Sequence, residues 1–221
     1  MRAEKKRNTK YEILQHATKL FIEKGYTDAY VTSIANELGI STGNLTFHFP
    51  TKEHILTELV KELCMLPKRE SESSFKGEHS LLTGYLLELA MIASVCRDNS
   101  NIEDLIVNAY TRPMSLAIIR KSDVGRAKEV FGKYHSGWTE EDYIQTENVI
   151  SGIEFSLFMT GNTEKISFEQ RVISSLDAIM KVYEIPKNIR ESAIAEVMSL
   201  DYCSMGGKLF ERFCSYVEAK M

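Results

Sequence analysis

Hydrophobic positions recur at helical spacing near the start of the chain. Between Thr9 and Gly25 the apolar residues fall on one side of a helix: Ile13, Leu14, Ala17, Leu20 and Phe21. Thr9 and Glu12 have the spacing of a capping box, and glycine is the usual residue at a left-handed helix end. The pattern therefore predicts a first helix that starts at Thr9 and stops at Gly25.

Two shorter apolar groups follow, each bounded by its own signals. Thr32 is placed to cap a helix that ends at Gly39, and Ser41 is placed to cap another that ends before Pro50. Three capped helices within about fifty residues predict a compact amino-terminal unit.

A fourth helix is predicted from Thr51 to Pro67. Its apolar face, too wide for a solvated linker, consists of Ile55, Leu56, Leu59, Val60 and Leu63. The segment from Lys68 to Glu78 is rich in serine and charge, so we expect it to form the loop between a small front domain and a larger rear one.

Behind this boundary the helical pattern repeats, and no strand pattern competes with it. Capping boxes at Thr139 and Ser167 start the two strongest segments. Pro113 is expected to kink one helix, and Gly206-Gly207 to divide the last helical region. The apolar stripes lie within 81–92, 102–117, 124–134, 142–158, 172–179 and 188–213. The predicted fold class is all-α.

Composition and charge fit an ordinary globular helical chain. Of 221 residues, 43% are hydrophobic and 26% charged, with only four prolines to punctuate short strands. The net charge is −4, yet residues 1–52 carry eight Lys/Arg against five Asp/Glu. A basic front before an acidic remainder favours contact with a polyanion at the front alone. The charged amino terminus lacks an apolar leader, so we expect a cytoplasmic protein.

Motifs for catalysis or metal binding are missing from the sequence. The four cysteines form no CxxC pair and the five histidines lack metal-ligand spacing. HExxH, a phosphate-binding glycine loop, GxSxG and a dinucleotide fingerprint are also missing. We therefore expect no metal, no cofactor and no enzymatic activity.

The segment 31–49 has the spacing of a helix-turn-helix, with its turn at Gly39. Small residues at the start of the second helix, Ser41, Thr42 and Gly43, would let the backbone approach phosphates and base edges closely. Asn44 would project an amide that pairs with a base edge, usually adenine.

From Thr9 to Leu59 the chain resembles the DNA-binding domain of TetR-family transcriptional regulators. The resemblance is carried, without gaps in each run, by ILQHATKLFIEKGY (13–26), VTSIANELGISTGNL (31–45) and HFPTKE (48–53). It implies an all-helical homodimer whose front domain binds operator DNA and whose rear domain binds a small effector that releases it. The expected domains are a helix-turn-helix DNA-binding domain with a basic arm (1–52), a connecting helix (53–67) and an effector-binding and dimerisation domain (68–221).

The same resemblance implies which residues contact DNA. Phosphate contacts are expected from Thr32, Ser41, His48 and Lys52, and base-edge contacts from Asn44, Gly43 and Thr42, with Phe47 either at the DNA or simply packed. Thr32 and Ser41 would cap helices in any case, and His48 has a structural alternative at a helix end.

The sequence departs from the family pattern on the second helix of the motif. The family usually has a basic residue where Thr42 stands and phenols where Thr46 and Phe47 stand. DNA affinity should suffer, unless the basic arm tracks the DNA backbone; a solvated tail is the alternative for that arm. A competing hypothesis is therefore a TetR-like small-molecule-binding or protein-interaction module with weak or no operator binding.

The rear domain offers weaker signals. The helices at 139–160 and 167–183 are expected to form the dimer bundle, as late helices do in this family. Residues 202–221 either pack on the body or cover the pocket. Aromatic, soft or polar side chains interleaved with core positions are the effector-pocket candidates, although each is alternatively plain core: Tyr85, Glu88, Met91, Tyr110, Arg112, Met114, Tyr134, Phe155 and Phe158.

Overall fold

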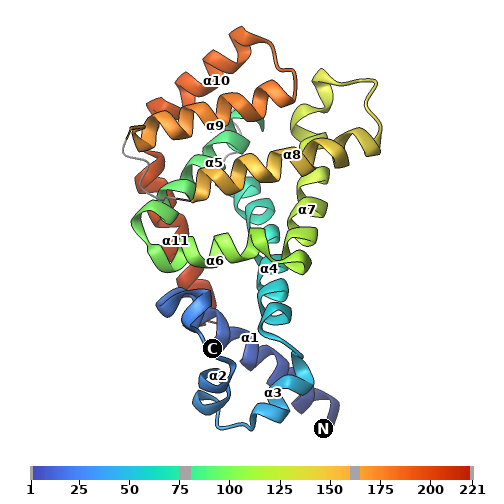
Figure 1. Ribbon diagram of the computed structural model, residues 1–221, viewed down its shortest axis with the longest axis vertical. Helices are drawn as coiled ribbons and strands as arrows, with labels where there is room; N and C mark the ends of the chain where they lie inside the picture. Colours follow the sequence, from blue (N-terminus) through green and yellow to red (C-terminus); the bar gives the residue numbers. More distant parts are fainter. Residues whose placement is uncertain (1, 75–80, 160–164, 220–221) are drawn as a thin grey trace.

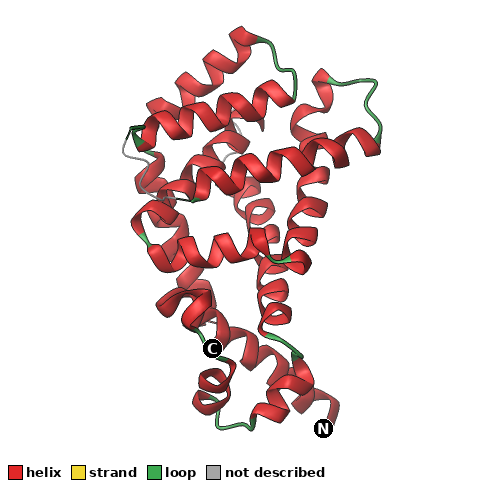
Figure 2. Cartoon of the chain, viewed as in Figure 1, coloured by secondary structure: helices red, strands yellow, loops and turns green. Residues whose placement is uncertain are grey.

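The computed structural model describes residues 2–74, 81–159 and 165–219, and these are arranged as helices joined by short loops, without a strand (Figures 1 and 2). The prediction of an all-α fold is confirmed. Within the described ranges, no helix is long and apolar enough to cross a membrane. The elements are α1 (Arg2–Asp28), α2 (Val31–Glu37), α3 (Thr42–His48), α4 (Lys52–Ser74), α5 (Leu81–Asp98), α6 (Ser100–Thr111), α7 (Pro113–Phe131), the short 3-10 helix η1 (Gly132–Tyr134), α8 (Glu140–Phe158), α9 (Phe168–Val182), α10 (Lys187–Ser199) and α11 (Tyr202–Ala219).

The first helix is longer than its sequence signals indicate. α1 begins at Arg2, so Thr9 lies inside it and does not start it. The Ala, Glu, Lys and Arg residues before Thr9 are strong helix formers, which explains why the helix extends back through them. Gly25 interrupts the helical dihedrals with φ of 79° and ψ of 163°, so its φ is positive as expected, but it does not adopt the left-handed helical conformation that was predicted.

The next two helices form the predicted helix-turn-helix. Tyr30, in extended conformation, precedes α2 without a side-chain cap, so the expectation that Thr32 caps this helix was wrong: Thr32 is already its second residue. Gly39 adopts φ of 63°, and the N–H of Ile40 donates to the carbonyl of Ala35 at 3.0 Å, which closes a Schellman-type helix end.

The fourth helix connects the two parts of the molecule. α4 runs to Ser74, so Pro67 does not end it and residues 68–74 are not the predicted loop; residues 75–78 of that prediction lie outside the described residues. A proline removes one helical hydrogen bond, but its φ is compatible with a helix, so a helix is able to continue through it.

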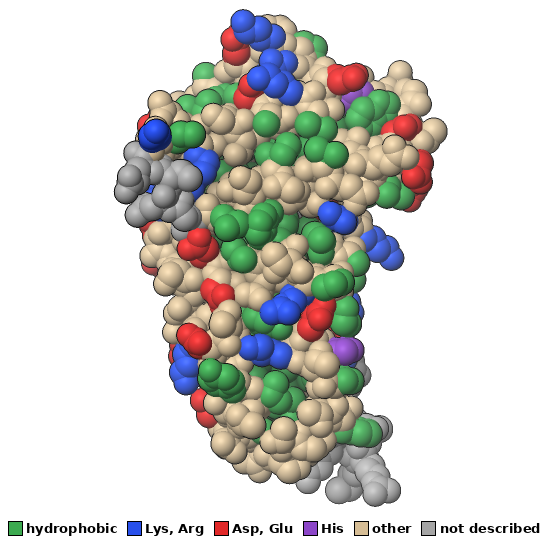
Figure 3. All heavy atoms as spheres, in the orientation of Figure 1, with side chains coloured by type: hydrophobic (Ala, Val, Ile, Leu, Met, Phe, Trp, Pro, Cys, Tyr) green, Lys and Arg blue, Asp and Glu red, His purple; other side chains and the backbone are tan. Residues whose placement is uncertain are grey.

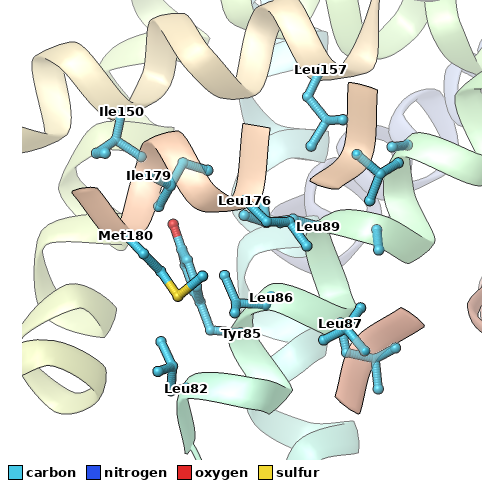
Figure 4. Close-up of a cluster of buried hydrophobic side chains, with 14 of the residues drawn as sticks. Leu82, Tyr85, Leu86, Leu87, Leu89, Ile150, Leu157, Leu176, Ile179 and Met180 are labelled. Carbon is cyan, nitrogen blue, oxygen red and sulfur yellow. The ribbon is translucent and has the colours of Figure 1, made fainter. Parts of the chain in front are cut away.

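The rear part is a bundle built around α5. Figure 4 shows leucines of α5 gathered with residues of α8 and α9 in one buried cluster: Leu86 and Leu89, Ile150 and Leu157, and Leu176 and Ile179. The capping boxes at Thr139 and Ser167 are both present, as predicted. These buried contacts fix the positions from which side chains reach the interior.

Two predicted breaks in the rear part were misplaced. Pro113 does not kink a helix: α6 ends at Thr111, Arg112 is extended, and Pro113 occupies the first position of α7, where its missing N–H costs nothing. Gly206 and Gly207 lie within α11, and the division falls at Leu200 and Asp201 instead.

The last helix links the two parts. α11 packs along α5 and its far end reaches α1, so the carboxyl-terminal helix lies on the body of the molecule (Figure 1). A Cβ added at Gly206 would lie only 2.8 Å from the carbonyl oxygen of Met91, which explains a glycine at this crossing. Phe213 packs against the core of the front domain.

Candidate nucleic-acid interface and effector site

α3 is anchored by one buried residue and one cap. Leu45 is fully buried in the front core. The Ser41 hydroxyl oxygen accepts the backbone N–H of Asn44 at 3.1 Å, as its sequence position predicts. The helix is therefore held on its inner side, and its other residues are oriented by that anchor.

The outer side of α3 carries the candidate base-reading residues. Thr42, Gly43 and Asn44 are all exposed, and Phe47 is 66% exposed. The half-buried His48 ring packs edge-on against the Phe47 ring, with centroids 5.4 Å apart. The outer side of α3 therefore carries small and polar residues at its start and aromatic residues at its end. Thr32 on α2 is exposed as well.

Lys52 is engaged inside the protein. Its ammonium donates to the carbonyl of Tyr26 at 2.7 Å and to that of Thr27 at 3.2 Å, and it lies 4.4 Å from the centroid of the Tyr26 ring. Burial lowers the pKa of Lys52, partly offset by the charge of Asp104. The contacts tie the end of α1 to the start of α4, a role that the sequence did not indicate.

A carboxylate on α6 joins the two parts of the molecule. Asp104 accepts the backbone N–H of Thr27 at 2.7 Å and the Thr27 hydroxyl at 2.6 Å. Gly25 lies against it so closely that an added Cβ would be 2.9 Å from the carboxylate. On the same side Asn101 donates to the carbonyl of Glu23 at 2.7 Å. The end of α1 is therefore hydrogen-bonded to α6.

Two residues predicted for the effector pocket belong to this junction instead. The Arg112 guanidinium lies 5.8 Å from the centroid of the Tyr26 ring, and the N–H of Met114 donates to Glu53 of α4 at 3.0 Å. Both are exposed in the chain that the structure describes. They lie at the junction because the break before Pro113 brings the start of α7 toward α4.

Four of the predicted pocket residues do meet inside the rear bundle. The Tyr85 and Tyr110 hydroxyls donate to the two carboxylate oxygens of Glu154, at 3.2 and 3.0 Å. Phe158 packs edge-on against Tyr110. Glu88 pairs with Arg126, whose guanidinium also lies 5.0 Å from the centroid of the Tyr85 ring.

The remaining candidates are dispersed. Met91 is a buried residue of the α5 core, and Phe155 is half-buried on α8. Tyr134 borders a surface pocket of about 360 Å³ between η1, α5 and α10, together with Lys133 and Glu196. Sequence spacing did not separate these three from the residues around Glu154.

Sequence reasoning missed the most unusual buried groups. Glu147 and Glu154 on α8 are only 1% and 2% exposed, and Tyr183 of α9 donates a hydrogen bond to Glu147. The signal was available: Glu147, Ile150, Glu154 and Leu157 share one face of a helix at the spacing of an apolar stripe. Among the described residues no group of histidine, cysteine and carboxylate side chains is arranged to hold a metal.

A comparison with solved structures finds a protein of similar fold. The transcriptional regulator FadR from Bacillus subtilis, in complex with stearoyl-CoA, is 16% identical with a TM-score of 0.52, over 79% of this chain and 98% of that one. TylP, a TetR regulator from Streptomyces fradiae, is 16% identical with a TM-score of 0.47, over 92% and 96%. A γ-butyrolactone receptor, an ArpA-like protein, is 16% identical with a TM-score of 0.46, over 90% and 97%. Curated protein sequences give no significant match.

The sequence of the front domain identifies a family, which the similarity of fold alone does not. Residues 13–59 match the sequence model of a family described as "Bacterial regulatory proteins, tetR family". That segment begins within α1, includes the helix-turn-helix of α2 and α3, and ends within α4. The front domain of this chain therefore belongs to the TetR family of bacterial regulatory proteins, as a helix-turn-helix DNA-binding domain.

Proposed function

We propose that this protein is a dimeric transcriptional regulator that binds operator DNA through α3 and is released from it by a small effector. The observation that carries the proposal is the outward side of α3, where Thr42, Gly43 and Asn44 are exposed on a TetR-family domain. The protein then acts in the cytoplasm as a repressor and catalyses no reaction.

Recognition of sequence falls to Asn44, because its amide is able to pair with an adenine edge in the major groove. Thr42 and Gly43 allow close approach, and Ser41, Thr32 and His48 supply phosphate contacts. Lys52 is expected to position the front helices, since its ammonium is engaged with the carbonyls of Tyr26 and Thr27. In a dimer, two copies of α3 enter major grooves about 34–36 Å apart on a palindromic site.

We place the dimer contact on α8 and α9, which pack side by side. Val149 of α8 is 54% exposed, and Ile144 of the same helix and Met159 directly after it are also exposed. Figure 3 shows hydrophobic side chains gathered on the face that carries these helices. Burying such a surface against a second copy is favourable, and a two-fold pair of front domains matches a palindromic operator.

The dimer is tested by introducing a charge into that face. Val149→Asp should shift the protein from dimer to monomer in sedimentation velocity, because a carboxylate would be buried at the contact. Leu81→Asp, which changes another exposed hydrophobic residue at the start of α5, is the matched control and should leave the dimer intact.

The regulator hypothesis is tested by sequencing genomic DNA fragments that the purified protein retains at moderate salt. The wild type should retain a few palindromes. Asn44→Ala should weaken retention of those sites by about 10- to 100-fold, the effect of losing one good base contact. Asn188→Ala, an exposed residue of α10, should retain the same fragments as the wild type. Featureless retention by all three proteins would contradict sequence-specific regulation.

A second function has its own support. The seven residues of α3 include no lysine or arginine, Phe47 is 66% exposed, and Lys52 is engaged internally. These features fit an interaction or small-molecule-binding module with weak operator affinity. Its signature is partner binding that persists at high salt, whereas binding to DNA falls steeply as salt rises.

A further inference from the structure

The interior of the rear bundle holds more acidic than basic side chains. Glu147 and Glu154 of α8 are 1% and 2% exposed. Burial raises the pKa of Asp123 on α7, and the charges of Glu154 and Glu147 raise it further. Burial also raises the pKa of Glu154, and the charge of Glu147 adds to that effect. Arg126 is the positive group that faces them in the described part of the chain. Arg126 is paired with Glu88 through two contacts, and its charge also lowers the pKa of the other three carboxyls, so a single guanidinium serves four acidic side chains.

One carboxylate oxygen in this cluster has no partner. Oε1 of Glu147 accepts a hydrogen bond from Tyr183, but Oε2 is buried and lacks a hydrogen-bond partner among the described residues. Native proteins rarely leave a buried carboxylate oxygen in this state, because water is lost and nothing replaces it. The oxygen is therefore left able to accept a hydrogen bond from a further donor.

Aromatic rings surround the two glutamates. Tyr85 and Tyr110 hold Glu154, while Tyr183 holds Glu147 and stacks on Phe131 with centroids 3.8 Å apart. Figure 4 shows Tyr85 reaching from α5 toward α8 and α9. Rings with carboxylates between them form the kind of surrounding that favours an organic cation over an anion.

The cluster also borders the surface. The side chains of Glu88 and Arg126 are 14% and 26% exposed, so the ion pair at the edge of the cluster is in contact with solvent. The pair joins α5 to α7. A ligand would meet this ion pair first and the buried glutamates behind it.

We propose that the effector of this protein is an organic cation, an apolar amine or quaternary ammonium whose charged nitrogen lies between Glu147 and Glu154. The proposal rests on the proposed function, in which the rear domain binds an effector. The cation supplies the positive charge that the cluster lacks, and an amine also donates to the unpartnered oxygen of Glu147. An anionic effector would instead meet three carboxylates.

The test compares three probes that share one apolar part: phenylbutyl-trimethylammonium, phenylbutanol and phenylbutyrate. Isothermal titration calorimetry at about pH 8 should show the ammonium binding at least about tenfold more tightly than the alcohol, and no binding of the carboxylate. Glu147→Gln and Glu154→Gln should each reduce that preference, whereas Glu141→Gln, an exposed carboxylate on the same helix, should preserve it. Equal binding of ammonium and alcohol, binding of neither, or a preference that survives both cluster variants would overturn the proposal.

A second measurement uses the wild type alone, in case a cluster variant does not fold. Burial raises the pKa of Glu147 to about 7, and burial also raises that of Glu154. The groups facing them are Tyr85 and Glu88 on α5, Tyr110 on α6, Asp123 and Arg126 on α7, and Tyr183 on α9. Binding of the ammonium near neutral pH should release protons, seen as heats that depend on the ionisation enthalpy of the buffer. Binding without proton release would contradict the assignment.

The two proposals fail separately. Retention of operator DNA by the ligand-free protein tests whether it is a regulator, and calorimetry tests whether its effector is a cation. If the protein retains palindromic DNA but shows no preference for the cation, only the proposed effector class is overturned. Cation binding by a protein that retains no palindrome overturns the regulator and leaves the ligand site.

Discussion

At the scale of single residues, the decisive contrast is between polar groups at the surface and polar groups inside. Ser41 performs the capping task that its position predicts, since a cap depends only on residues within three positions. Glu147 and Glu154 were overlooked because charged side chains are exposed by default. Their burial depends on Tyr85 of α5, Tyr110 of α6 and Tyr183, which directly follows α9.

The buried glutamates predict a particular pH dependence of stability. The pKa of Glu147 is raised by burial from 4.5 to about 7 in the folded state. Between these values the unfolded chain is ionised while the folded chain holds a proton, so the free energy of unfolding falls as pH rises, by up to about 3 kcal/mol. Urea titrations from about pH 5 to pH 8 should show this fall, and Glu147→Gln should make the curve flatter. Parallel curves for the two proteins would show that Glu147 does not cause it.

At the scale of helices, capping signals predicted some helix starts correctly and missed others. Thr139 and Ser167 begin α8 and α9 as predicted, whereas α1 extends back beyond Thr9 and α4 continues beyond Pro67. A capping sequence states where a helix is able to begin. Whether it does begin there depends on the helix propensity of the residues before it and on the packing available to them.

The two adjacent glycines of α11 predict different effects of the same substitution. A Cβ at Gly206 would lie 2.8 Å from the Met91 carbonyl oxygen, while at Gly207 nothing lies within 4 Å. Gly206→Ala should therefore destabilise the protein by about 1–3 kcal/mol through overpacking. Gly207→Ala should stabilise it by about 0.5–1 kcal/mol, since alanine is the better helix former. Thermal unfolding of both variants measures the difference, and similar melting temperatures would exclude close packing of α11 on α5.

At the scale of the whole molecule, the front and rear parts are joined by more than the connecting helix. α4 links them covalently, α6 holds the end of α1 through Asp104 and Asn101, and α11 reaches α1 from the carboxyl-terminal side. Leu105 and Ala109 of α6 even contribute to the front hydrophobic core. A movement in the rear bundle would therefore be transmitted through packed contacts to α1 and the other helices that pack against α3.

The junction predicts that one carboxylate controls local opening of α1. Asp104→Ala removes both acceptors of Thr27 and should cost about 1–3 kcal/mol locally, because hydrogen bonds to a charged group are lost. Hydrogen exchange followed by mass spectrometry should show faster exchange in peptides around Thr27, while peptides from α8 remain unchanged. Glu129→Ala, an exposed carboxylate of α7, is the control and should match the wild type.

The sequence by itself determined the helical class, the helix-turn-helix at 31–49 and the exposed candidates on α3. These features are local: apolar periodicity, caps and a glycine turn require only neighbouring residues. Only the tertiary structure decided that Lys52 serves the interior, that Arg112 and Met114 lie at the junction, and that two glutamates lie beside three tyrosines. The reason is physical: burial and pairing of a polar side chain depend on helices distant in sequence, whose packing no local pattern specifies.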